Sequence, residues 1–183
     1  GFYAGNGIYK VRFLPPKVGT FQYRISGCVE GEGTFLVEPA DSSRHGMVQA
    51  RGEHFAYEDG TPYSPFGTTV YALVHQTEEL IGQTMDSLSK APFNKIRFCV
   101  FPKSYDYNHN EPQWYAFEKD ADGNWDVHSP CLAFWDALED RIRELDRMGI
   151  EADLILFHPY DRWGFDALPQ KDNLVYLDYV IRR

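Results

Sequence analysis

The sequence predicts a mixed α/β fold in which the last strands of a β-sandwich precede the first three β/α units of a (β/α)8 (TIM) barrel. Residues 1–39 hold short runs whose polar and apolar positions alternate with a period of two, which indicates antiparallel strands. From residue 66 onward, apolar strands alternate with amphipathic helices, as in parallel βαβ units. With 183 residues and 43% hydrophobic content, the chain is long enough to bury a core.

The N-terminal part contains three segments with strand character. They are "IYKVRFLP", "FQYRIS" and "TFLVEP", and we expect them to pair as three antiparallel strands. Such a small meander needs a second sheet to cover its apolar face, so residues 1–39 predict the C-terminal strands of a sandwich domain. Residues 40–65 predict a polar linker followed by a hairpin that turns at Asp59-Gly60.

The C-terminal part, residues 66–183, repeats the order strand, helix. The strands are "FGTTVYA", "NKIRFCVF" and "ADLILF". We expect the second helix to begin at Ser129, with Pro130 in its first turn, and to end at Gly149. The apolar faces of the three helices are predicted from spacings of three and four: Ile81, Met85 and Leu88; Leu132, Trp135, Leu138, Ile142, Leu145 and Met148; Leu174, Leu177 and Ile181.

Two architectures fit parallel βαβ units, an open doubly wound sheet and a closed barrel. An open nucleotide-binding sheet needs a glycine-rich turn after its first strand, and "VYALVHQTEE" has none, which favours the barrel. A barrel of this kind needs about 250 residues. We therefore expect at most three of its eight units here, and the remaining strands from further sequence of the same protein or from a partner chain.

The residues that follow the three predicted strands are rich in groups that bind polar ligands. In open parallel sheets and in barrels alike, ligands bind at the carboxyl ends of the strands. The connections at the opposite ends, "KAPFN" and "RMGIE", are short and plain. The candidate ligand-binding residues are Tyr71 and His75 after the first strand, Tyr105, Tyr107, His109 and Asn110 after the second, and His158, Tyr160, Asp161 and Trp163 after the third.

Each of these clusters also has a purely structural interpretation. His158 could be capped by a backbone carbonyl, and Asp161 and Arg162 could form ion pairs with neighbouring loops. The connection after the second strand could be packed by its own aromatic rings, although its length favours a functional role. "DADGNWD" lacks the bidentate Glu of a calcium loop and predicts a turn. His75, His109 and His158 lack a His-x-His pair, so we expect no metal.

Composition excludes several partners. The net charge is −9 and no Lys/Arg run occurs, so we expect neither nucleic-acid nor membrane binding. Cys28, Cys99 and Cys131 form no CxxC pair, which argues against a disulfide framework or a zinc site, and we expect no cofactor. The chain opens without Met and we expect it to begin partway through a longer protein. A cytoplasmic location is our expectation, with secretion left open for that reason.

Four stretches make the sequence resemble bacterial glycoside hydrolases that carry an apiosidase-like (β/α)8 barrel after a small immunoglobulin-like sandwich. They are "GNGIYKVRFLPPKVGTFQY", "YEDGTPYSPFGTTVYALVHQ", "FNKIRFCVFPKSYDYNHNEP" and "GIEADLILFHPYDRWGF". The resemblance implies a retaining glycosidase whose acid/base Glu follows the fourth strand and whose nucleophile follows the seventh. It implies no catalytic residue in this chain.

What the resemblance carries over is the early part of a carbohydrate pocket. Pyranose rings present flat C–H faces to Tyr and Trp, and hydroxyl groups to His, Asn, Asp and Arg. The alternative is a non-catalytic carbohydrate-binding or scaffolding piece, and a metallohydrolase is a third hypothesis. The residues implied in substrate binding are Tyr71, His75, Arg97, Tyr107, His109, Asn110, His158, Tyr160 and Trp163.

Overall fold

A computed structural model describes residues 1–27, 29–42 and 44–183 of the chain. They form two compact units, one built from Gly1–Val11 and Pro65–Arg183 and the other from Arg12–Ser64. The fold is mixed α/β, as predicted from the sequence, and its sheets are small and separate. The predicted division into a sandwich and a barrel stays a prediction.

The smaller unit contains two antiparallel hairpins. Strand β3 (Gly19–Ile25) pairs with β4 (Gly31–Val37), and β5 (Val48–Arg51) pairs with β6 (His54–Tyr57). The chain then reverses again at Asp59-Gly60, where the Gly60 amide donates to the Tyr57 carbonyl at 2.9 Å. The predicted turn is therefore confirmed, and it follows a hairpin that the sequence did not predict.

The prediction of a three-stranded N-terminal meander is wrong. Strand β1 (Phe2–Tyr3) pairs with β2 (Tyr9–Lys10) as a separate two-stranded sheet in the larger unit. Strand β2 pairs with β1 instead of β3 because Gly5, Asn6 and Gly7 all have positive φ and turn the chain back on itself within a few residues.

The centre of the larger unit is a three-stranded parallel sheet in the order β11-β8-β7. These strands are β7 (Gly67–Thr69), β8 (Lys95–Cys99) and β11 (Glu151–Ile155), and they confirm the three predicted parallel strands. Strand β7 approaches β8 so closely that a Cβ on Gly67 would lie 2.2 Å from the Lys95 carbonyl oxygen. Only glycine fits there.

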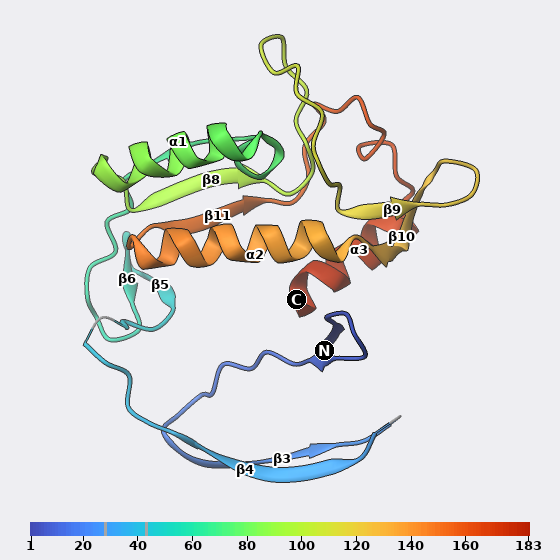
Figure 1. Ribbon diagram of the computed structural model, residues 1–183. Coiled ribbons are helices and arrows are strands. Elements are labelled where there is room, and N and C mark those ends of the chain that lie inside the picture. The colour runs from blue at the N-terminus through green and yellow to red at the C-terminus, as the bar shows by residue number, and fades with distance from the viewer. Residues whose placement is uncertain (28, 43) are drawn as a thin grey trace. The chain divides into compact units, whose positions relative to one another are not determined.

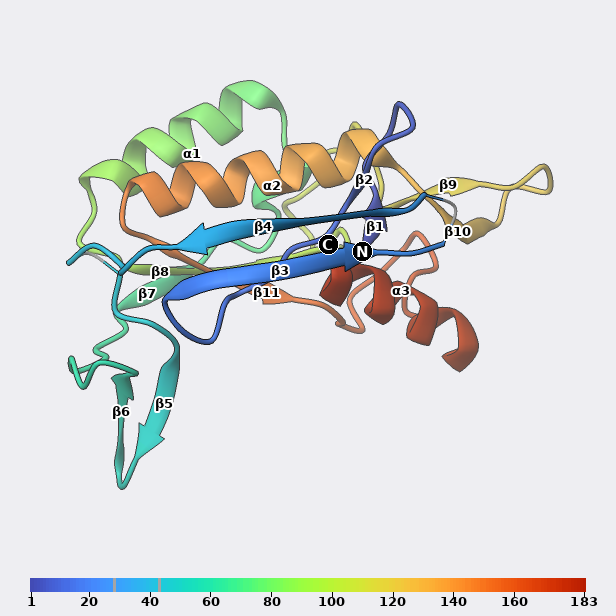
Figure 2. The ribbon, with the colours of Figure 1, turned by 90° about the horizontal axis from the view of Figure 1, so that it is seen from below.

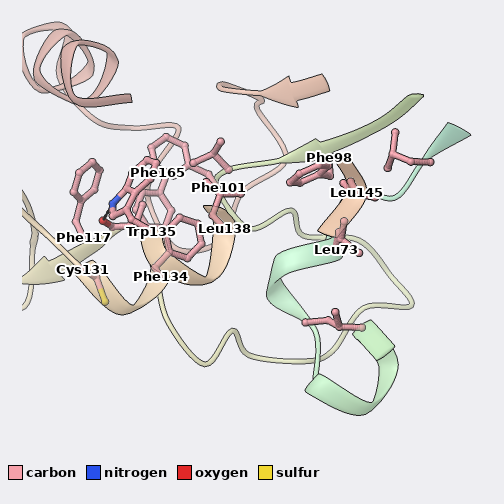
Figure 3. Close-up of a cluster of buried hydrophobic side chains, with 14 of the residues drawn as sticks. Leu73, Phe98, Phe101, Phe117, Cys131, Phe134, Trp135, Leu138, Leu145 and Phe165 are labelled. Atoms are coloured by element: carbon pink, nitrogen blue, oxygen red, sulfur yellow. Dashed lines mark hydrogen bonds between the residues drawn. The ribbon is translucent and has the colours of Figure 1, made fainter. Parts of the chain in front are cut away.

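Two helices, α1 (Glu78–Lys90) and α2 (Leu132–Arg147), cover one face of this sheet (Figures 1 and 2). The Thr77 hydroxyl caps α1 by accepting from the Leu80 amide at 3.3 Å, and the predicted apolar face of α1 is buried. Gly149, at φ 74°, follows the end of α2 as predicted. The core lies between the helices and the sheet, with Phe98 and Leu145 fully buried in it (Figure 3).

Two predicted features of the helices are wrong. Helix α2 begins at Leu132 rather than Ser129, because Trp125–Pro130 form strand β10 and pair with β9 (Phe117–Lys119). The "DADGNWD" segment is the turn of that hairpin, as expected. In α3 (Gln170–Arg182), Tyr176 is the buried residue, whereas the predicted contacts Leu174 and Ile181 are exposed. A short 3-10 helix, η1 (Leu73–His75), completes the unit.

Candidate functional site

A pocket of about 650 Å³ opens beside the carboxyl ends of β7 and β8. It lies between the end of β7, the first turns of α1 and the loop that follows β8, which extends past the strand ends in Figure 1. Five predicted ligand-binding residues line it together: Tyr71, Tyr105, Tyr107, His109 and Asn110. Burial raises the pKa of the Tyr105 phenol.

A cluster of amide side chains orders the pocket. The Gln76 Nε2 donates to Asn108 Oδ1 at 2.9 Å, and the Asn110 Nδ2 donates to Gln76 Oε1 at 2.5 Å. Gln76 follows η1 directly, while the two asparagines lie in the loop after β8. One amide side chain thus uses its donor and its acceptor to hold this loop against the start of α1.

A cation at the strand ends brings the three loops together. The Lys103 Nζ lies 3.6 Å from the centroid of the Tyr71 ring, 4.7 Å from that of Tyr160 and 5.7 Å from that of Tyr105. These rings follow β7, β11 and β8, respectively. The Ser104 amide also donates to the Tyr160 carbonyl at 2.8 Å. We call Lys103 and its three tyrosines the Lys103 cluster; a cation over ring faces is attractive by about 0.5–2 kcal/mol per contact.

The two histidines of the strand ends bind backbone carbonyls. His75 is 2% exposed, donates from Nε2 to the Val100 carbonyl at 3.1 Å and stacks on Phe134. Burial lowers the pKa of His75 to about 4, so its ring is neutral at pH 7. His158 donates from Nε2 to the Phe101 carbonyl at 3.1 Å. The capped-histidine interpretation therefore describes both residues, and neither lines the pocket.

Arg97 lies apart from the pocket, on the face of the sheet opposite the buried Ile96 and Phe98. Its Nη2 pairs with Asp153 Oδ2 on the adjacent strand at 3.0 Å, and the Lys95 Nζ lies 3.7 Å from the same oxygen. These three residues line a separate shallow hollow of about 200 Å³. The structure thus places Arg97 in a cross-strand ion-pair network of the sheet.

A second polar cluster links the loop after β8 to the loop after β11. The carboxylate of Glu111 accepts from Trp163 Nε1 and from the Tyr115 hydroxyl, both at 2.8 Å, and pairs with Arg162 at 2.6 Å. Hydrogen bonds from Trp163 and Tyr115 lower the pKa of Glu111, which is therefore ionised at neutral pH. Burial raises the pKa of Tyr115 to about 12 and keeps it a donor.

Asp161 has a local structural role within the loop after β11. Its carboxylate accepts from the Trp163 amide at 2.7 Å and from the Asp166 amide at 2.9 Å. Such backbone hydrogen bonds set the course of the loop and place the Trp163 ring beside Glu111. The ion-pair interpretation of this segment is confirmed for Arg162, which pairs with the preceding loop.

Across 1–27, 29–42 and 44–183, no group of three or more His, Cys, Asp or Glu residues could hold a metal ion. Cys99 and Cys131 are free, and burial raises the pKa of both thiols, to about 11 for Cys99. Cys28 lies outside the described residues. None of the described helices is both long and apolar enough to span a membrane.

Sequence reasoning missed three residues of this site: Lys103, Gln76 and Glu111. Each lies in or next to a segment that was recognised as a strand end. A lone lysine, glutamine or glutamate has no pattern that separates it from a solvated surface residue. The available signal was position, because all three lie in the connections on the carboxyl side of β7 and β8.

The pocket lies at the carboxyl ends of parallel strands, where α/β folds bind their ligands. Residues 1–27 match the family "Domain of unknown function (DUF5060)". No curated protein matches the chain. A crystal structure of "a putative glycoside hydrolase from Bacteroides vulgatus ATCC 8482" is similar over 100% of this chain, with 46% sequence identity and a TM-score of 0.92.

The chain spans 39% of the length of that Bacteroides protein. A glycoside hydrolase family 5 structure, also from Bacteroides vulgatus ATCC 8482, is similar over 74% of this chain and 29% of its own, with 14% identity and a TM-score of 0.50. At that identity the likeness concerns the fold alone. The resemblance to glycoside hydrolases seen in the sequence is therefore supported, while its apiosidase-like barrel and its sandwich stay predictions.

Proposed function

We propose that the protein hydrolyses O-glycosidic bonds in carbohydrates, and that this chain forms the early part of its substrate pocket, on the first three β/α units of a (β/α)8 barrel. The observation that carries the proposal is the meeting of three strand ends around Lys103, beside a pocket lined by tyrosine rings and amide groups. The similarity of the whole chain to a structure described as a glycoside hydrolase supports it.

The pocket supplies both kinds of contact that a sugar ring needs. Tyr107 is 86% exposed, so its ring is open to the C–H face of a pyranose. Tyr71 is 40% exposed, and the Lys103 ammonium lies over one face of its ring. Asn110 and His109 on the same wall offer donors and acceptors for hydroxyl groups. The amide cluster holds Asn110 in place before a ligand arrives, which lowers the entropy cost of binding.

The proposed mechanism is a double displacement with retention of configuration. It requires two carboxyl groups about 5 Å apart, one as acid/base and one as nucleophile. The described residues that line the pocket include no Asp or Glu. We assign both carboxyl groups to the part of the full-length protein outside this sequence, in keeping with the 39% of the similar glycoside hydrolase that the chain spans.

Turnover of a panel of aryl glycosides by the full-length protein tests the proposal. We expect Tyr71→Ala and Tyr107→Ala to lower kcat/KM by about three- to tenfold each, the range of a lost aromatic contact. Tyr23→Ala, an exposed tyrosine of the smaller unit, is the matched control and should have no effect. NMR of the first-formed anomer tests retention. An inactive wild-type protein, or full activity in both pocket variants, would contradict the proposal.

A second candidate function is carbohydrate binding without hydrolysis. The lack of a carboxylate among the described lining residues is the observation that favours it. Calorimetric titration with the same glycosides separates the two functions, because a binding protein shows heat of binding and no release of the aryl group. Detectable turnover by the full-length protein eliminates this candidate.

A further inference from the structure

We propose that the saccharide bound in this pocket carries an anionic group, a carboxylate or a sulfate, which pairs with the ammonium of Lys103. This inference rests on the proposed function, since it names the class of sugar that the pocket selects.

Lys103 supplies the positive charge of the pocket. Among the described lining residues it is the one Lys, Arg, Asp or Glu side chain. No carboxylate in the described part of the chain lies within ion-pair distance of it, whereas Arg97 and Arg162 in the same unit each meet one. The 183 residues together carry −9 and repel anions at long range, so an unpaired ammonium inside a pocket marks a local site for an anion.

The aromatic rings hold the ammonium without neutralising it. Tyr71 and Tyr160 contact the Lys103 Nζ with their ring faces, at 3.6 and 4.7 Å from the ring centroids. They shield part of the charge from water, and Lys103 is half-buried. A partly desolvated cation attracts an anion more strongly than a fully solvated one does. The cluster therefore fixes a charged donor in one position beside the pocket.

The other groups of the pocket fit the rest of an acidic sugar. Asn110 and His109 can hold hydroxyl groups, and the Tyr107 ring can take the sugar face. A neutral sugar would use these contacts and leave Lys103 unpaired, whereas an acidic sugar uses all of them. The ion pair should thus add selectivity on top of a contact set that neutral sugars share.

The test compares each acidic oligosaccharide with its matched neutral form, using the full-length protein and calorimetric titration. One arm uses uronate-containing oligosaccharides and their carboxyl-reduced counterparts, and the other uses sulfated oligosaccharides and their desulfated counterparts. We expect the acidic form of one arm to bind about ten- to a hundredfold more tightly, the range of a charge-assisted hydrogen bond. This preference should shrink as salt is raised, because the screening length shortens.

Two variants and one control assign the preference to Lys103. Lys103→Met should bind acidic and neutral forms alike, and Lys103→Arg should keep a preference because it keeps the charge. Lys119→Met is the matched control, since its Nζ also lies over a ring, at 4.7 Å from Trp125, outside the pocket. It should keep the full preference.

The outcomes separate this inference from the proposed function. Equal binding of acidic and neutral forms in both arms, or a preference that survives in Lys103→Met, overturns the inference and leaves glycoside hydrolysis standing. If neither the acidic nor the neutral form binds in either arm, the inference is overturned as well. Absence of aryl glycoside turnover by the wild-type protein is the separate result that defeats the proposed function. An acidic preference that disappears in Lys103→Met and persists in Lys119→Met supports the inference.

Discussion

Acidification should destabilise this protein through His75 before its carboxylates are protonated. The His75 ring is 2% exposed, its Nε2 donates to the Val100 carbonyl, and its Nδ1 has no hydrogen-bond partner among the described residues. Burial lowers its pKa from 6.5 to about 4, so the folded protein holds the ring neutral while the unfolded chain protonates it. The unfolded state therefore binds more protons between these two values, and stability falls as the pH falls.

The size of the effect follows from the two pKa values. The contribution is fully present above pH 6.5, falls as the pH drops below that value, and is exhausted near pH 4. Between about pH 7.5 and about pH 5, linkage gives a loss of about 2 kcal/mol in the free energy of unfolding. His75→Gln should remove this loss, because the Gln amide can still donate to the Val100 carbonyl and does not titrate.

Urea denaturation at a series of pH values, followed by tryptophan fluorescence, measures the effect. His128→Gln is the matched control, since His128 is exposed on β10 in the same unit, and it should keep the wild-type pH dependence. A His75→Gln variant that loses stability on acidification as steeply as the wild type would refute the reasoning. It would show that His75 does not resist protonation in the folded state.

Three further predictions concern packing and loop order. Tyr176→Phe should cost about 1 kcal/mol for its lost hydrogen bond and Tyr176→Ala about 3–5 kcal/mol, against less than about 0.5 kcal/mol for the exposed Leu174→Ala on the same helix. Equal costs for Tyr176→Ala and Leu174→Ala in urea denaturation would contradict the observed face of α3. Gln76→Ala should weaken sugar binding about tenfold by releasing the amide cluster. Gln83→Ala, at an exposed site of α1, is the control and should leave the affinity unchanged; unchanged affinity of Gln76→Ala in calorimetric titration would argue against this role. Hydrogen bonds lower the pKa of Glu111 below its usual 4.5, so the contacts of Glu111 with Trp163 and Tyr115 should persist at pH 4.5 and break only at lower pH. A tryptophan fluorescence transition in that acid range should be absent in Glu111→Gln. An identical transition in the variant would show that other groups cause it.

Local signals predicted the elements whose information lies within a few residues. Helix α1 needs only the Thr77 cap and the spacing of Ile81, Met85 and Leu88, and the structure has both. The parallel strands were predicted from their apolar runs, and a pocket at their carboxyl ends followed from the geometry of parallel sheets. The short length of the strands and the β9–β10 hairpin within the long loop after β8 were not predicted.

Features that depend on contacts between residues far apart in the sequence were predicted wrongly or not at all. In α3 the stripe of Leu174 and Ile181 and the stripe of Tyr176 and Val180 both have helical spacing. Tyr176 is buried because Phe101, 4.4 Å away between ring centroids, and other rings of the core meet that side of the helix. The start of α2 likewise depended on a strand pairing that reaches back to Phe117.

By itself, the sequence determined the alternation of strands and helices, the edge of the sheet where polar and aromatic groups gather, and the likeness to glycoside hydrolases, because each rests on periodicity or on contiguous stretches. Only the tertiary structure decided which of those groups meet. His75 binds a carbonyl in the core, Arg97 pairs across the sheet, and Lys103 lies among rings from three strand ends. The physical reason is that hydrogen bonds, ion pairs and cation–π contacts act over a few ångströms, between residues that the chain separates by tens of positions.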